Sequence, residues 1–245
     1  MVIGVYGLGR FGSFWADCLA KRFVVKAYSR NPTRPTPTRV QRVSEDEVLL
    51  CDALFLCVAI SSMSAVLERI ADRIPASTLV LDTCSVKVEP IRLMQSILPE
   101  SIRVIGTHPM FGPDSGKSGV EGLPLCFCPA RVSESVSERW RTIFQSMGLA
   151  VFERSPEEHD REAAYTQGVT HFVGRVLGNL GLVQSEISTL GYQKLLDIIE
   201  QTCNDPMQLF LDLQRFNPYT GEMHDRLTAA LARVRADLES VDLDE

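Results

Sequence analysis

The stretch VIGVYGLGRFG at residues 2–12 decides the fold of this chain. Its apolar beginning, Val2 to Tyr6, predicts a short buried strand, and a helical pattern follows the glycines. Gly7, Gly9 and Gly12 have the G-x-G-x-x-G spacing. In that pattern the first glycine permits a tight turn, the second lets the backbone approach a pyrophosphate, and the third lets the helix pack on the strand. The stretch therefore predicts a nucleotide-binding loop between a first strand and a first helix.

Strand-like and helical patterns alternate over the first part of the chain. Further apolar runs typical of buried strands lie at residues 23–28, 53–59, 78–81, 102–106 and 125–128. Strands that alternate with helices predict a mostly parallel sheet covered on both faces. After Phe152 the periodicity is helical, beginning with Ser155-Pro156-Glu157-Glu158, which is typical of a helix start. We predict an α/β fold, with a Rossmann-type doubly wound domain over residues 1–153 and a smaller all-helical domain over residues 154–245.

The composition favours a small-molecule partner. The chain has 245 residues and a formal charge of −6, so it lacks the basic balance that binding to nucleic acid needs. No apolar run is long enough to span a membrane, and the N-terminus is typical of a strand rather than a signal peptide, so we expect a cytoplasmic protein. The seven cysteines include no CxxC pair, which predicts reduced thiols and no metal site.

The end of the second predicted strand indicates which nicotinamide cofactor the loop would hold. The sequence there is Tyr28-Ser29-Arg30-Asn31, without the carboxylate that would bind a ribose 2′-hydroxyl and repel a 2′-phosphate. Ser29 and Arg30 can both donate to a 2′-phosphate, although Arg30 could also be a solvated surface residue. We therefore predict NADP. The expected cofactor contacts are Gly7, Leu8, Gly9, Arg10, Phe11, Gly12, Ser29, Arg30, Cys57 and Val58.

Two polar segments follow neighbouring predicted strands and are candidates for the chemistry. One is GTHPMFGPDSG at residues 106–116, and the other is DTCSVK at residues 82–87. His108 in the first segment can accept a proton near neutral pH. Ser85 in the second can orient a substrate hydroxyl, or it can simply cap the next helix. Because strand ends of a parallel sheet meet at one edge, both side chains are expected at the edge where ligands bind.

These segments, together with GLGRFG and HDREAAYTQGVTHFVGR, make the chain resemble the prephenate and arogenate dehydrogenases of tyrosine biosynthesis over nearly its whole length. The resemblance implies oxidative decarboxylation of a cyclohexadienyl acid, with hydride leaving the ring carbon that bears the hydroxyl. It implies that His108 polarises or deprotonates that hydroxyl and that Ser85 is hydrogen-bonded to both. It also implies that loss of carbon dioxide makes the ring aromatic and the step effectively irreversible.

The resemblance extends to the helical domain. It implies that Gln167 and His171 face the substrate, and that His159 and Asp160 order their helix. Gln193 is a further candidate substrate contact, because it takes the position where many bacterial members have an arginine for the ring carboxylate. That difference leaves the carboxylate anchor open.

Asp205 would suit the ammonium group of arogenate, which prephenate lacks, because a carboxylate can pair with that cation. Equally, Asp205-Pro206 could only cap a helix.

Several alternatives remain open from the sequence. Prephenate dehydrogenase would use the same His108 and Ser85, whereas a β-hydroxyacid dehydrogenase or imine reductase would place its acid-base residue on the interdomain helix. A non-catalytic NADP-sensing protein would not need His108 at all. Lys87 and Lys117 could each be a solvated charge. The helical domain has more apolar residues than it can bury alone, which predicts a homodimer formed through its helices.

Overall fold

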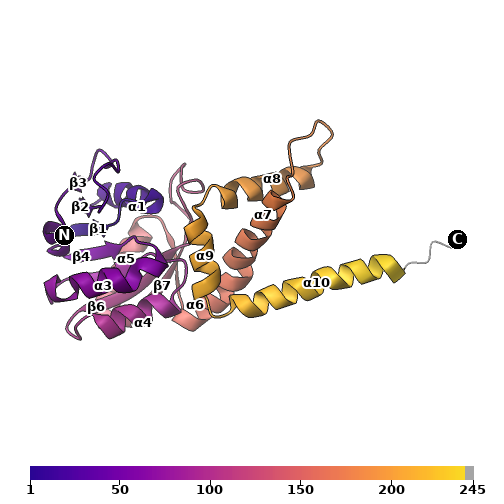
Figure 1. Cartoon of the computed structure of the whole chain (residues 1–245). Coiled ribbons are helices and arrows are strands. Elements are labelled where there is room, and N and C mark those ends of the chain that lie inside the picture. Colours follow the sequence, from indigo (N-terminus) through magenta and orange to yellow (C-terminus); the bar gives the residue numbers. More distant parts are fainter. Residues whose placement is uncertain (241–245) are drawn as a thin grey trace. The chain divides into compact units, whose positions relative to one another are not determined.

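The computed structural model describes residues 1–240 and contains two compact units. The first covers Met1–His159 and the second begins at Asp160, so the division falls inside helix α6 (Pro156–Ala163). Helix α6 begins as predicted, because the Ser155 hydroxyl accepts from the Glu158 amide while the Glu158 carboxylate accepts from the Ser155 amide. Figure 1 shows the sheet unit in indigo to magenta and the helical unit in orange to yellow.

The first unit is built on one eight-stranded sheet, in the order β3-β2-β1-β4-β5-β6-β7-β8. Only the β6–β7 pair is antiparallel, so the predicted Rossmann-type, mostly parallel sheet is confirmed. The order reverses between β1 and β4, which is the point where this architecture binds ligands. The strands are β1 (Val2–Tyr6), β2 (Val24–Tyr28), β3 (Gln41–Arg42), β4 (Ala53–Leu56), β5 (Leu79–Asp82), β6 (Arg103–Pro109), β7 (Pro124–Arg131) and β8 (Ala150–Glu153).

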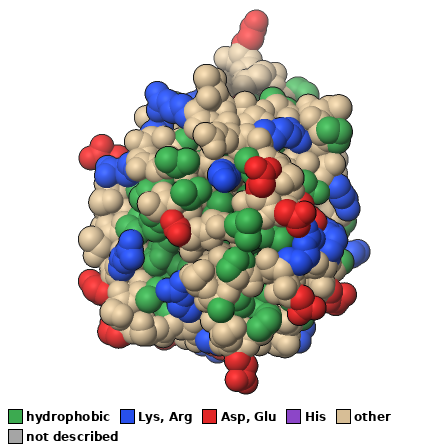
Figure 2. Space-filling view, turned by 90° about the vertical axis from the view of Figure 1, so that its left-hand side faces the viewer, with side chains coloured by type: hydrophobic (Ala, Val, Ile, Leu, Met, Phe, Trp, Pro, Cys, Tyr) green, Lys and Arg blue, Asp and Glu red, His purple; other side chains and the backbone are tan. Residues whose placement is uncertain are grey.

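Helices cover both faces of this sheet. On one face α1 (Arg10–Ala20) and α5 (Glu134–Ser146) enclose an apolar core in which Trp15 meets Phe55 edge-on, with ring centroids 5.9 Å apart. Ile105 belongs to that core, whereas the neighbouring Gly106 faces Ile91 of α4 on the other side. The helices of that other face are α2 (Glu45–Leu49), α3 (Met63–Ile70) and α4 (Val88–Ile97). In Figure 2, which views the molecule from the left of Figure 1, acidic and basic side chains are interspersed.

The second unit is helical. After α6, a π-helical turn, η3 (Ala164–Gly168), leads into α7 (Val169–Asn179), and α8 (Leu190–Cys203), α9 (Met207–Phe216) and α10 (Thr220–Ser240) follow. Helices α7 and α8 pack very closely, because a Cβ at Gly174 would lie 2.2 Å from the Thr202 hydroxyl oxygen. Through Ser240, where the description stops, no helix has the length and apolar character needed to cross a membrane.

Candidate functional site

The glycine loop lies at the carboxyl end of β1, where two of its glycines are sterically required. Gly7 has a φ of +113°, and a Cβ there would lie 2.3 Å from the Cys57 carbonyl oxygen. A Cβ at Gly12 would lie 1.9 Å from the Gly7 carbonyl oxygen. By contrast, a Cβ at Gly9 would meet nothing within 4 Å, and Gly9 is the N-cap of α1 with no side-chain cap. The open space beside the first amides of α1 fits a pyrophosphate.

The other residues of the loop divide between core and surface. Leu8 is buried in the apolar core, and the Phe11 ring stacks near Trp15 with centroids 6.1 Å apart. These two residues can therefore reach a cofactor mainly through their backbone. The Arg10 guanidinium forms an ion pair of 2.5 Å with Asp114, which lies in the loop after β6. Arg10 thus ties the glycine loop to the segment that follows His108.

Cys57 and Val58 border the glycine loop from the end of β4. The Cys57 amide donates to the Tyr6 carbonyl oxygen at 2.9 Å, and Val58 Cγ1 would lie 3.4 Å from a Cβ at Gly7. Burial raises the pKa of the Cys57 thiol to about 12, so the thiol is neutral at physiological pH. Both residues therefore lie beside the glycine loop, and their contact with a cofactor stays a prediction.

The loop after β2 contains Ser29 and the exposed Arg30 and is organised by an arginine that the sequence did not single out. Arg42, in β3, donates to the carbonyl oxygens of Ser29, Asn31 and Arg34 at 3.3, 2.8 and 2.6 Å. A two-residue strand after a proline-rich loop gives no periodic signal, which is why β3 and Arg42 were not predicted. Arg42 fixes the backbone that presents Ser29 and Arg30.

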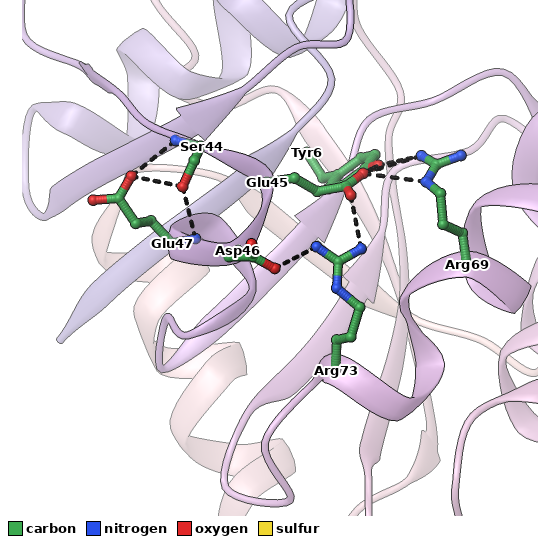
Figure 3. A network of polar contacts seen from close by, with 7 residues as sticks. All are labelled: Tyr6, Ser44, Glu45, Asp46, Glu47, Arg69 and Arg73. Atoms are coloured by element: carbon green, nitrogen blue, oxygen red, sulfur yellow. Dashed lines mark hydrogen bonds and ion pairs between the residues drawn. The ribbon is translucent and has the colours of Figure 1, made fainter.

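A network of charged side chains surrounds the end of β1 on the face of α2 and α3 (Figure 3). The Tyr6 hydroxyl donates to Glu45 and accepts from Arg69, and Arg73 donates to Glu45 at 2.7 Å and to Asp46 at 2.5 Å. Burial, followed by the hydrogen bond to the Glu45 carboxylate, raises the pKa of Tyr6 to about 12. The network joins α2 and the end of α3 to the strand that precedes the glycine loop.

The two catalytic candidates lie at neighbouring strand ends. Ser85 follows β5, and His108 lies within β6 rather than in a loop, because β7 pairs with β6 as far as the Pro109–Leu125 register. Both side chains are buried, at 6% and 3% exposure. The Ser85 hydroxyl finds no hydrogen-bond partner within residues 1–240. A buried hydroxyl without a partner is unusual and is expected where a ligand completes the bond.

A buried ion pair connects these two strand ends. Lys87, which the sequence left as a possible solvated charge, is fully buried, and its ammonium group contacts the Asp82 carboxylate and donates to the Thr107 carbonyl oxygen at 2.6 Å. Asp82 in turn accepts from the amides of Cys84 and Thr107 at 2.9 and 3.2 Å. Burial lowers the pKa of Lys87, but Asp82 outweighs that effect and the net pKa is raised. Lys87 therefore stays charged and holds the residues that precede His108.

His108 has a second imidazole as its partner. Its Nδ1 lies 2.8 Å from Nε2 of His159, and the rings meet edge-on with centroids 5.1 Å apart. His159 is buried in α6, where its amide donates to the Ser155 carbonyl oxygen. The resemblance implied that His159 orders its helix, and the structure gives it a direct contact with the candidate base as well. Its distance of 51 residues from His108 in sequence explains why periodicity could not reveal this pair.

In the helical unit, three of the four predicted substrate residues lie near one another. Gln167 lies in η3 and His171 one turn later in α7, and Asp205 acts electrostatically on His171. Burial, opposed by Asp205, lowers the pKa of His171, so its imidazole is neutral at pH 7. Gln193, in contrast, lies in the first turn of α8 and donates to Asp197 at 3.3 Å. It is roughly 15 Å along the helix axis from the end of α8 near Asp205.

Two family models match the chain. One, described as the nucleotide-binding domain of prephenate dehydrogenase, matches residues 38–128, and one described as the C-terminal domain of TYRAAT1-like proteins matches residues 176–245. Among solved structures, prephenate dehydrogenase from A. aeolicus, in complex with hydroxyphenyl propionate and NAD+, has a TM-score of 0.73 at 16% identity, covering 98% of this chain and 92% of that one. Synechocystis arogenate dehydrogenase has a TM-score of 0.68 at 17% identity, with coverages of 98% and 94%. These structures share the fold.

Curated relatives are more similar in sequence. The chain is 36% identical to arogenate dehydrogenase 2, chloroplastic, of Arabidopsis thaliana, over 96% of this chain and 69% of that protein. It is 35% identical to arogenate dehydrogenase 1, chloroplastic, of the same plant, over 96% of this chain and 39% of that longer protein. The chain belongs to the family of arogenate and prephenate dehydrogenases and is an oxidoreductase that uses a nicotinamide cofactor.

Proposed function

We propose that the protein oxidises arogenate to tyrosine with NADP, with loss of carbon dioxide. The observation that supports this most strongly is the buried His108–His159 pair at the sheet edge, one strand away from the buried Ser85 hydroxyl. A base and a hydroxyl donor at that edge suit the oxidation of a ring carbinol. In this proposal residues 1–153 bind NADP, and residues 154–245 supply substrate contacts and the dimer interface.

The proton path follows from the tautomers of the two histidines. For Nε2 of His108 to accept the substrate hydroxyl proton, its Nδ1 must donate to Nε2 of His159. The positive charge that then develops on His108 is stabilised by the lone pair of His159, which can take the Nδ1 proton. Ser85 would orient the hydroxyl toward His108. When bound, NADP would supply the acceptor for the hydride of the same ring carbon, and the ring carboxylate of the substrate would leave as carbon dioxide as the ring becomes aromatic.

NADP is proposed over NAD because of the loop after β2. Ser29 and Arg30 follow that strand without a carboxylate, and Arg42 holds their backbone in place. An arginine binds a 2′-phosphate with a forked, charge-assisted contact. The other expected contacts of the cofactor are those of the glycine loop, with Cys57 and Val58 beside it.

Arogenate is proposed over prephenate because of Asp205. A carboxylate at the amino-acid end of the substrate pairs with the arogenate ammonium group and repels a keto acid. Gln167 and the neutral His171 would contribute hydrogen bonds without adding charge. The relatives named above as arogenate dehydrogenases support this choice, and a preference for prephenate would keep the roles of His108 and Ser85 while removing that of Asp205.

A homodimer formed through the helical unit is part of the proposal. Several large apolar side chains of this unit are exposed, including Ile187 at 92% and Leu190 at 87%. Exposed apolar surface of this kind marks a protein interface. The cytoplasmic location expected from the sequence stays a prediction, and the Arabidopsis relatives are named as chloroplastic proteins.

Initial rates test the proposal directly. The purified protein would be assayed with arogenate and with prephenate, each with NADP and with NAD, by following the absorbance of the reduced cofactor. We expect turnover of arogenate with NADP. A non-catalytic NADP-binding protein would bind the cofactor and turn over neither substrate, and replacing its His108 would leave its behaviour unchanged.

A further inference from the structure

The helical unit contains a cavity of about 550 Å³ between α7, α8 and α9. Its walls are mostly apolar and include the rings of Phe172 and Phe210. Arg175 is the one charged side chain among the described residues that line it. A cavity of this size, mainly apolar with one oriented polar group, is typical of a small-molecule site.

The guanidinium of Arg175 is only partly satisfied. Its Nη2 donates to the backbone carbonyl oxygen of Asp205 at 2.7 Å, and its Cζ atom lies 5.6 Å from the centre of the Phe210 ring. Its Nε is buried and has no hydrogen-bond partner in the described part of the chain. A buried cationic N–H without an acceptor is costly, so an oxygen from a ligand is expected there.

Two more unsatisfied atoms lie on the same stretch of helix. Arg175 follows His171 by one turn of α7, so the two side chains share a face. His171 Nδ1, and Oε1 of Gln167 one turn earlier, are also buried without a hydrogen-bond partner within residues 1–240. A π-helical turn, η3, contains Gln167, and such turns often occur at functional sites. The unsatisfied atoms thus form one row that leads to Arg175.

Arg175 and Asp205 together bring opposite charges to one end of this row. The backbone contact between them fixes Asp205 beside the guanidinium, and both charges act on His171. An α-amino acid presents a carboxylate and an ammonium group on the same carbon, which is the charge pattern that a neighbouring cation and anion recognise.

We propose that Arg175 binds the α-carboxylate at the amino-acid end of the substrate, beside the ammonium group bound by Asp205. This assignment rests on the proposed function and makes Arg175 a binding residue for arogenate and for tyrosine, whose amino-acid end is the same. Prephenate, a keto acid, keeps the contact with Arg175 and loses the one with Asp205.

Three small probes separate the two contacts in calorimetric titrations of the full chain at fixed NADP. Tyrosine has both charged groups, 3-(4-hydroxyphenyl)propionate has only the carboxylate, and tyramine has only the ammonium group. We expect Arg175→Gln to weaken the binding of tyrosine and of hydroxyphenylpropionate about tenfold or more. The affinity for tyramine should change less than about twofold. Asp205→Asn should weaken the binding of tyrosine and of tyramine and leave the affinity for hydroxyphenylpropionate unchanged. Arg233→Gln, at an exposed position of α10, is the matched control.

The outcomes are decisive in both directions. Equal losses for all three probes, or no loss of hydroxyphenylpropionate binding in Arg175→Gln, would overturn the assignment, as would a wild-type chain that binds none of them. If Arg175→Gln fails to fold by circular dichroism, Arg175→Lys keeps the charge, loses the forked geometry, and should bind hydroxyphenylpropionate more weakly than wild type. Because these titrations need no turnover, a protein that binds tyrosine through Arg175 yet does not oxidise arogenate would contradict the proposed function alone.

Discussion

Nδ1 of His108 lies 2.8 Å from Nε2 of His159, and both imidazoles are buried. Two imidazoles at this distance share one proton, so the tautomer of each depends on the other. In the proposed function, Nε2 is the atom of His108 that accepts the proton of the substrate hydroxyl. We therefore propose that His159 is a positioning residue for His108.

Replacing either histidine should lower turnover by different amounts. His108→Asn should reduce kcat on the order of a hundredfold or more, with cofactor affinity little changed. His159→Phe should reduce kcat by roughly tenfold and shift the pH dependence of kcat/KM, because the partner that sets the tautomer is lost. Steady-state kinetics from pH 5.5 to 9 check this, with His224→Gln in the helical unit as control. An unchanged pH profile in His159→Phe would rule out the positioning role.

Lys87 should contribute strongly to the stability of the folded protein. Lys87→Met leaves the buried Asp82 carboxylate without its cation, and removing one partner of a buried pair costs about 3–5 kcal/mol. Urea unfolding would measure this loss, and Asp82→Asn combined with Lys87→Met should recover part of it. The control is Lys117→Met, because Lys117 is exposed. Equal stability of the two lysine variants would show that the buried ion pair contributes nothing.

Tyr6 should make the protein sensitive to alkaline pH. The pKa of Tyr6 rises from 10.0 to about 12 on folding, so the folded state holds this proton more tightly than the unfolded state. The stabilising contribution of the neutral Tyr6 is complete below pH 10 and is lost as the pH rises from 10 to 12, by at most roughly 3 kcal/mol. Urea unfolding at several pH values should show that the free energy of unfolding falls less steeply with rising pH in Tyr6→Phe than in wild type. As a control, the free energy of unfolding of Tyr192→Phe should fall with pH as in the wild type. The same fall in all three proteins would refute the role of Tyr6.

The loop after β2 should determine the cofactor preference. Arg30→Gln should raise the KM for NADP about tenfold or more and leave the KM for NAD within about twofold, because only the 2′-phosphate contact is lost. Arg42→Gln should have a smaller effect in the same direction, since Arg42 acts through the loop carbonyl groups. Arg22→Gln serves as the control, because Arg22 is an exposed arginine that follows α1. An equal rise in the KM for NADP and in the KM for NAD in Arg30→Gln would argue against a 2′-phosphate contact.

The exposed apolar residues of the helical unit should hold the dimer together. Ile187→Glu with Leu190→Glu places charges on this surface and should convert a dimer into a monomer in light scattering coupled to size exclusion. Leu50→Glu changes a leucine of the sheet unit that is 67% exposed and should leave the assembly intact. A wild-type monomer at micromolar concentration would remove the dimer from the proposal.

Local patterns were sufficient for the sheet unit but not for its long-range contacts. The apolar runs and the glycine spacing predicted most of the strands and the loop at Gly7, because those signals lie within a few residues. The short strands β3 and β8 were missed, since few residues form each and their neighbours in the sheet stabilise them. The partners of His108 and Lys87 come from other strands and helices. Their identity depends on packing that a single sequence does not reveal.

Gly174 has a further consequence for how binding and assembly are related. The Thr202 hydroxyl occupies the space that a side chain at position 174 would need. The backbone of α7 at Gly174 therefore lies directly against the Thr202 side chain of α8. Two helices in such close contact are expected to move together as one rigid body. Any shift of α7 that accompanies filling of the cavity is therefore transmitted to α8, the helix that begins at the exposed Leu190. Ligand affinity and subunit association in this protein should be thermodynamically linked.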